Sequence, residues 1–116
     1  MRLLVQRVLA PFDCSIVEAT NGYNALFAME RAMPDLILLD VNMPIMGGLE
    51  MLTLMRSNPT LKAVPVIMLT SPADHAIMDQ LAALGTHGHL MKPISPDALL
   101  EEIRNAIDLS PAKPAA

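Results

Sequence analysis

The sequence is poor in cysteine, in aromatic residues and in clustered positive charge, and each shortage narrows the class of protein. Its one cysteine, Cys14, cannot form an internal disulfide, which is typical of a reducing cytoplasm. Aromatic residues make up 3% of the 116 residues and tryptophan is absent, so the core must use aliphatic side chains and the ten methionines. The net charge of -4 and the lack of a Lys/Arg run argue against a nucleic-acid partner.

Long apolar runs are also missing. No stretch approaches the roughly 18 apolar residues of a membrane span, and the start, Met1-Arg2-Leu3-Leu4-Val5, lacks the length and cleavage site of a signal peptide. We therefore expect a cytoplasmic protein without a membrane partner. The length fits one domain, which we place at 1–108, followed by a Pro/Ala-rich tail at 109–116 that is expected to be disordered.

Helical and strand patterns alternate along the chain, which predicts a parallel sheet with helices on both faces. Strands are predicted at 15–19, 36–39, 64–69 and 89–91. Helices are predicted at 2–10, between Asn21-Gly22 and Pro34, from Leu49 to before Asn58-Pro59, at 73–84 with Gly85 as its cap, and after Ser95-Pro96. Four methionines at helical spacing are predicted to lie in the core: Met29, Met33, Met51 and Met55.

Three polar residues lie where predicted strands end. Asp40 follows Leu36-Ile37-Leu38-Leu39, Thr70 ends the run from Val64 to Leu69, and Lys92 follows His89-Leu90-Met91. Because parallel strands end at the same edge of a sheet, an acid, a hydroxyl and an ammonium should converge there. Such a group is suited to a small anionic ligand.

The segments PDLILLDVNMP, VIMLTS and GHLMKP occur in this order, and together they resemble the receiver domain of bacterial two-component response regulators. The resemblance covers roughly residues 2 to 108. It implies an α/β fold of the flavodoxin-like (CheY-like) type, a three-layer sandwich around a parallel sheet.

The resemblance also implies a role for each matching residue. Asp40 would accept a phosphoryl group, Thr70 would hydrogen-bond one of its oxygens, and Lys92 would neutralise another. The carboxylate of Asp40 and the backbone carbonyl of Asn42 would bind Mg²⁺, the family's cofactor.

Two further positions match the family pattern. Pro93 is a candidate cis-proline that would direct the preceding lysine inward, and His89 occupies the place of the aromatic switch residue. A histidine there could also be a partly exposed strand residue without a switching role.

The family opens with a central strand that ends in two acidic residues, whereas this sequence opens in what should be the first helix. We therefore expect a fold truncated at the N-terminus, with four strands per chain, and impaired Mg²⁺ binding and phosphorylation. Either the strand at 15–19 moves beside 36–39, or a second chain completes the sheet by strand exchange or edge pairing. The second repair predicts a homodimer or larger assembly.

Two functions remain open. The first is a stand-alone, non-enzymatic receiver that takes phosphate from a histidine kinase or phosphotransfer protein. The second is a receiver-like scaffold that acts without phosphate, by oligomerisation or partner docking. A phosphatase of the haloacid dehalogenase type would need an acid two residues after Asp40, where this chain has Asn42.

Overall fold

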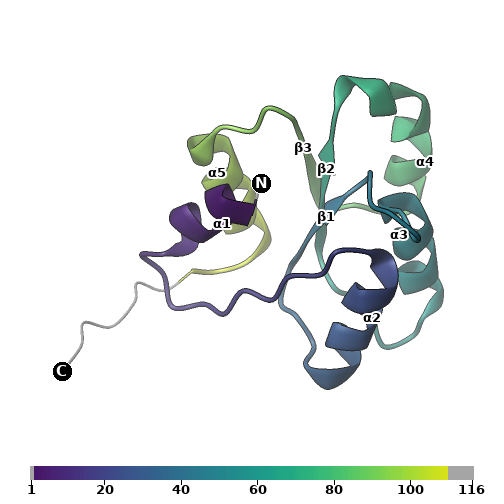
Figure 1. Ribbon diagram of the computed structural model, residues 1–116, viewed down its shortest axis with the longest axis horizontal. Helices are drawn as coiled ribbons and strands as arrows, with labels where there is room; N and C mark the ends of the chain where they lie inside the picture. Colours follow the sequence, from purple (N-terminus) through teal and green to yellow (C-terminus); the bar gives the residue numbers. More distant parts are fainter. Residues whose placement is uncertain (1, 110–116) are drawn as a thin grey trace.

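The computed structural model describes residues 2–109 and shows a three-stranded parallel sheet between two groups of helices (Figure 1). The strands are β1 (Ile37–Asp40), β2 (Val66–Thr70) and β3 (Gly88–Met91), in the order β1-β2-β3. Helices α1 (Arg2–Leu9) and α5 (Pro96–Ala106) lie on one side of the sheet. The other side carries α2 (Gly22–Arg31), α3 (Gly48–Ser57) and α4 (Met78–Ala83).

The helix ends follow the local signals in the sequence. The side chain of Asn21 accepts a hydrogen bond from the Asn24 backbone N–H at 2.9 Å and caps α2. Ser95 caps α5 in the same way, accepting from Ala98 N–H at 3.1 Å. The predicted helix at 73–84 divides into a 3₁₀-helix, η1 (Pro72–Ile77), and α4, with Gly85 following at a φ of +78°. Left-handed backbone is where glycine has no steric cost.

Two apolar cores form on the two faces of β2. Successive side chains of a strand point to opposite faces, so Met68 packs with α3 while Ile67 packs with α5, and both are fully buried. The methionine prediction is confirmed for three of the four residues, Met29, Met51 and Met55, which are at most 6% exposed. It is wrong for Met33, which lies beyond the end of α2 and is 48% exposed.

The strand predicted at 15–19 does not form, so the described residues give three strands rather than four. This segment connects α1 on one side of the sheet to α2 on the other (Figure 1), and Val17 within it is 75% exposed. Both of its ends are held, because α1 packs on α5 and Gly22 N–H donates to Met46 O at 3.1 Å. A strand also needs a neighbour that pairs with it, and the segment has none within the described sheet.

One edge of β1 is therefore unpaired within the described residues. Ile37 N–H donates to Pro65 O at 3.0 Å and Val41 N–H to Leu69 O at 3.2 Å, so odd-numbered residues face β2. By the alternation of a parallel ladder, the N–H groups of Leu38 and Asp40 face the opposite edge. The C-terminal part of the tail predicted at 109–116, residues 110–116, lies outside the described residues.

Candidate functional site

The carboxyl edge of the sheet brings the three predicted site residues together. Asp40 is the last residue of β1, Thr70 is the last of β2, and Lys92 directly follows β3. All three strands run in the same direction, so these ends meet at one edge.

Both carboxylate oxygens of Asp40 accept hydrogen bonds. Oδ2 accepts from Lys92 Nζ at 2.5 Å, and Oδ1 accepts from the backbone N–H of Asn42 at 2.9 Å. The side chains of Lys92 and Asp40 are 32% and 29% exposed, so the ion pair is open to solvent on one side. An incoming anionic group can therefore reach both the carboxylate and the ammonium.

The sheet fixes the position of Lys92. Its backbone N–H donates to Thr70 O at 2.7 Å, which continues the pairing of β2 with β3 by one residue, and the peptide bond to Pro93 is cis. The Thr70 side chain is fully buried, and its hydroxyl donates to Leu90 O at 3.4 Å. Thr70 thus lies at the site, but its hydroxyl is engaged with β3 rather than with Asp40.

Asp74, in η1, belongs to the same hydrogen-bonded group and was not predicted as a site residue. Asn42 Nδ2 donates to both of its carboxylate oxygens, at 3.2 and 3.3 Å. Ser71 donates to Oδ2 from its backbone N–H at 2.7 Å and from its hydroxyl at 3.1 Å. The Ser-x-x-Asp spacing of a capping box was the available signal for this residue.

These contacts also set the charge of Asp74. The backbone hydrogen bond from Ser71 is the largest cause that lowers the pKa of Asp74, and the side chains of Asn42 and Ser71 and the charge of Lys92 lower it further. Burial acts in the opposite direction on this pKa. The Asp74 residue is 7% exposed and carries its negative charge near the Asp40–Lys92 pair.

The loop after β1 contains a strained turn. Ile45 has a φ of 67° and is 78% exposed, and Met46 N–H donates across it to Pro44 O at 2.7 Å. This is the left-handed form of a three-residue γ-turn, which is rare and costly for a β-branched residue. The strain lies three residues beyond Asn42, in the loop that carries the site.

His89, the predicted switch residue, is exposed on β3. The alternation of this strand directs Leu90 toward the α5 side, whereas His89 and Met91 are exposed. The structure therefore places the histidine at the surface, whereas Thr70 is fully buried.

The described residues do not fit Mg²⁺ at this site. Mg²⁺ requires a nearly octahedral shell of oxygen ligands, and residues 2–109 contain no group of three or more acidic, histidine or cysteine side chains that could hold a metal ion. Asp40 uses both oxygens for Lys92 and Asn42, and Asp74 uses both for Asn42 and Ser71. The two expected ligands, the Asp40 carboxylate and the backbone carbonyl of Asn42, supply only a small part of such a shell.

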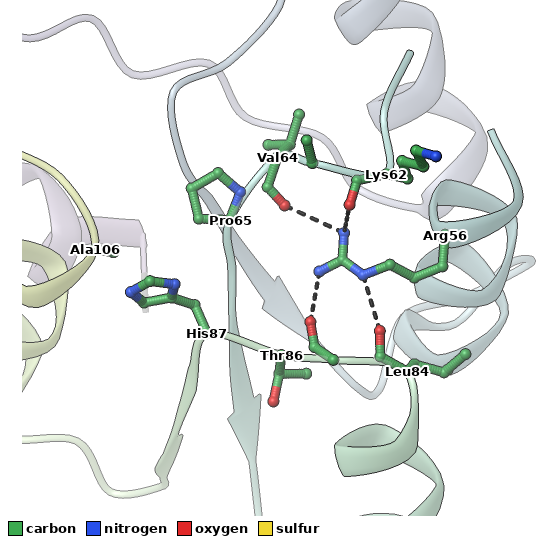
Figure 2. A pocket seen from close by; sticks show the side chains of 10 residues that line it. Arg56, Lys62, Val64, Pro65, Leu84, Thr86, His87 and Ala106 are labelled. Carbon is green, nitrogen blue, oxygen red and sulfur yellow. Dashed lines mark hydrogen bonds between the residues drawn. The ribbon is translucent and has the colours of Figure 1, made fainter. Parts of the chain in front are cut away.

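A cavity of about 580 Å³ lies at the opposite, amino edge of the sheet (Figure 2). Its wall includes Arg56, which donates from Nε to Leu84 O at 2.9 Å and from Nη2 to Gly85 O at 2.8 Å. Nη1 donates to Lys62 O at 2.9 Å and to Val64 O at 3.2 Å. Partial burial lowers the pKa of the Arg56 guanidinium. Because four of its five N–H donors bind backbone carbonyls, Arg56 holds two loops together rather than a ligand.

The family model for the response regulator receiver domain matches residues 1–104. The chain belongs to the response regulator receiver family. This result confirms the resemblance and the flavodoxin-like α/β fold class. Receiver domains are signalling modules of two-component systems, and the family typically binds Mg²⁺ and interacts with histidine kinases or phosphotransfer proteins. Within residues 2–109, no helix is long and apolar enough to cross a membrane.

Individual relatives are similar to this chain over about nine-tenths of its length. The probable transcriptional regulator ycf29 of Pyropia yezoensis is 34% identical over 105 residues, which are 89% of this chain but 46% of that protein. Chemotaxis protein CheY-3 of Vibrio cholerae is 31% identical over 104 residues, covering 89% of this chain and 80% of CheY-3. The structure of CheY4 from Vibrio cholerae aligns with a TM-score of 0.81 and 31% identity, covering 91% of this chain and 88% of that one.

Proposed function

We propose that this receiver works in a two-component phosphorelay with Asp40 as its phosphoacceptor. The observation that carries this proposal is the 2.5 Å contact between Asp40 Oδ2 and Lys92 Nζ at the open carboxyl edge. In transfer from a phosphohistidine, a carboxylate oxygen of Asp40 bonds to phosphorus while the P–N bond breaks, and the released imidazole nitrogen takes up a proton. Lys92 then stabilises the added negative charge, and Asn42 N–H remains available to an oxygen.

Phosphate-contacting roles for Thr70 and Lys92 follow from the same proposal. Lys92 is already in contact with the acceptor, whereas Thr70 must rotate its hydroxyl away from Leu90 O to bind a phosphoryl oxygen. His89 would respond to that rotation as the switch residue. The partner that supplies the phosphoryl group is a histidine kinase or a phosphotransfer protein, and the setting is cytoplasmic. We propose no enzymatic activity and no nucleic-acid or membrane partner.

We further propose that phosphoryl transfer to this 116-residue chain is weak. The described donors do not fit Mg²⁺, and a metal commonly stabilises the transition state by several kcal/mol. The test is incubation with acetyl phosphate, from which acetate leaves, with and without Mg²⁺, followed by intact mass. We expect slow partial phosphorylation of Asp40 with little response to Mg²⁺, and none in Asp40→Asn. Rapid complete conversion that requires Mg²⁺ would show that transfer is not impaired, and equal modification of Asp40→Asn would show that Asp40 is not the acceptor.

The second candidate is a scaffold that works through self-association, and the unpaired edge of β1 favours it. An exposed strand edge is a template for pairing with another chain, and the segment at 15–19 supplies β-branched residues, among them Val17 at 75% exposure. We propose a homodimer in which this segment of one copy pairs with β1 of the other.

Light scattering tests the dimer directly. We expect a mass of twice the 12.5 kDa chain, reduced to one chain in Val17→Asp. Phe27→Asp on α2 is the matched control, because Phe27 is 65% exposed and lies outside the proposed interface. A monomeric parent at micromolar concentration, or equal dissociation by both substitutions, would exclude this interface.

A further inference from the structure

A continuous set of contacts connects Asp40 to η1 without using Thr70. Asp40 Oδ1 accepts from Asn42 N–H at 2.9 Å, and the side-chain amide of Asn42 donates to Asp74. Asp74 in turn accepts from both the backbone and the side chain of Ser71, the residue that caps η1. Residue 42 thus contacts the acceptor through its backbone and Asp74 through its side chain.

The hydroxyl of Thr70 does not provide such a connection, because it is hydrogen-bonded to β3. Thr70 is fully buried with its hydroxyl on Leu90 O, and His89 is exposed. The contacts through Asn42 instead span 32 positions in sequence and join the loop after β1 to the first turn after β2. A change of hydrogen bonding at Asp40 would therefore reach η1 first by way of Asn42.

Electrostatic interactions connect the same group of residues. Asp40 and Asp74 are two carboxylates near one ammonium, since Lys92 contacts Asp40 and its charge also acts on Asp74. A phosphoryl group on Asp40 would add negative charge to this pair of acids and would compete for Lys92 and for Asn42 N–H. Like charges at short range oppose each other, so the amide of Asn42, which donates to both Asp74 oxygens, separates the two acids.

We propose that Asp74 is a positioning residue of the receiver site: it holds Asn42, sets the negative charge that an incoming phosphoryl group meets, and links Asp40 to η1. The proposal rests on the proposed role of Asp40 as phosphoacceptor. Its consequence is that phosphorylation of Asp40 and the ordering of η1 oppose each other through Asn42.

The test compares Asp74→Asn with two matched variants. Asp79→Asn removes the same charge from an exposed position in α4, and Ser71→Ala removes the hydroxyl contact to Asp74 but keeps the contact with Asn42. Amide hydrogen exchange is followed by NMR, and phosphorylation by acetyl phosphate is followed by intact mass.

In Asp74→Asn we expect the exchange rate of the Asn42 backbone amide to rise about fivefold and the rate of phosphorylation to rise about two- to fivefold. Neither should change in Asp79→Asn, and Ser71→Ala, which keeps the contact of Asp74 with Asn42, should change both by less than Asp74→Asn does. Faster exchange confined to η1, with the Asn42 amide and the phosphorylation rate unchanged, would reduce Asp74 to a helix cap and overturn the proposal.

Asn42→Ala tests the same contact from the other side. Because Asn42 is exposed, this variant should fold, and we expect faster exchange of the Ser71 amide that donates to Asp74. Unchanged exchange at Ser71 would contradict the link. If neither the parent chain nor any variant takes up phosphate, the proposed role of Asp40 as phosphoacceptor is wrong. The amide exchange rates still decide the role of Asp74 in that case.

Discussion

The two edges of the sheet each hold one cation, and they hold it in opposite ways. At the amino edge Arg56 donates to four backbone carbonyls, and the nearby left-handed residue is Gly85. At the carboxyl edge Lys92 binds one carboxylate that is about one-third exposed, and the left-handed residue is Ile45. The partners of the cation at the amino edge are backbone carbonyls, which cannot be chemically modified. The partner at the carboxyl edge is a carboxylate, which can be modified, and the strained residue lies in the loop that follows it.

The largest expected effect is the loss of Arg56. Arg56→Met keeps the unbranched aliphatic part of the side chain but leaves four carbonyls without their donor. A hydrogen bond to a charged group contributes about 1.5–3 kcal/mol net, and carbonyls that become open to water recover part of this loss. We expect the free energy of unfolding in urea to fall by about 2–4 kcal/mol. Arg104→Met is the control, because Arg104 contacts only the Phe12 ring, at 5.3 Å, among the interactions described. Equal losses in the two variants would remove the contrast between the edges.

The strained turn at the carboxyl edge should give an effect of opposite sign. Ile45→Asn places a residue that tolerates left-handed backbone at a φ of 67°, and we expect the protein to become more stable by about 1 kcal/mol. The measurement is the same urea titration, with Met33→Asn as the control, since Met33 is exposed outside the helices and strands but has no positive φ. Stabilisation by both substitutions would show that the gain comes from replacing an exposed apolar side chain and not from relief of backbone strain.

Lys92→Met should have a small effect on stability and a large one on chemistry. The ion pair with Asp40 is about one-third exposed, and pairs of this kind contribute roughly 0.2–1 kcal/mol. We expect the midpoint of urea unfolding to change little, while phosphorylation by acetyl phosphate falls at least about tenfold. A loss of stability as large as that of Arg56→Met would show that the two cations have the same structural role.

Acid should weaken the carboxyl edge through Asp74. Its pKa is lower in the folded protein than the usual value, so the unfolded chain takes up a proton first as the pH falls. The stabilisation from Asp74 is therefore complete above the usual carboxyl pKa, near 4, and is lost as the pH falls through the lower folded value. Urea unfolding between about pH 5 and pH 2 should show a shallower loss of stability in Asp74→Asn than in the parent chain or in Asp79→Asn. Identical slopes would contradict the assignment.

The site residues that could be predicted from the sequence are those whose position is set by a single strand. Asp40, Thr70 and Lys92 could be placed at one edge because each ends or directly follows a strand, and parallel strands share that edge. The contact of Asn42 with Asp74 could not be predicted, since it joins two loops whose separation is set by tertiary packing. The direction of the Thr70 hydroxyl has the same origin.

The predicted strand at 15–19 failed for a related reason. Ile16 and Val17 have high strand propensity, but a strand forms only where the chain can lie alongside the unpaired N–H and C=O groups of a neighbour. The anchors at α1 and at Gly22 direct this segment between the two helical layers instead. Local preference was correct for the helices, whose hydrogen bonds are internal, and insufficient for this strand.

The bond from Lys92 N–H to Thr70 O has a consequence for how receivers can vary. It fixes the backbone of Lys92 to β2, the central strand of the sheet, so the position of the charged side chain depends little on the sequence of residues 94–109. A chimera that carries α5 from another family member, with the buried Leu99 and Ile103 retained, should therefore keep the Asp40–Lys92 pair in place.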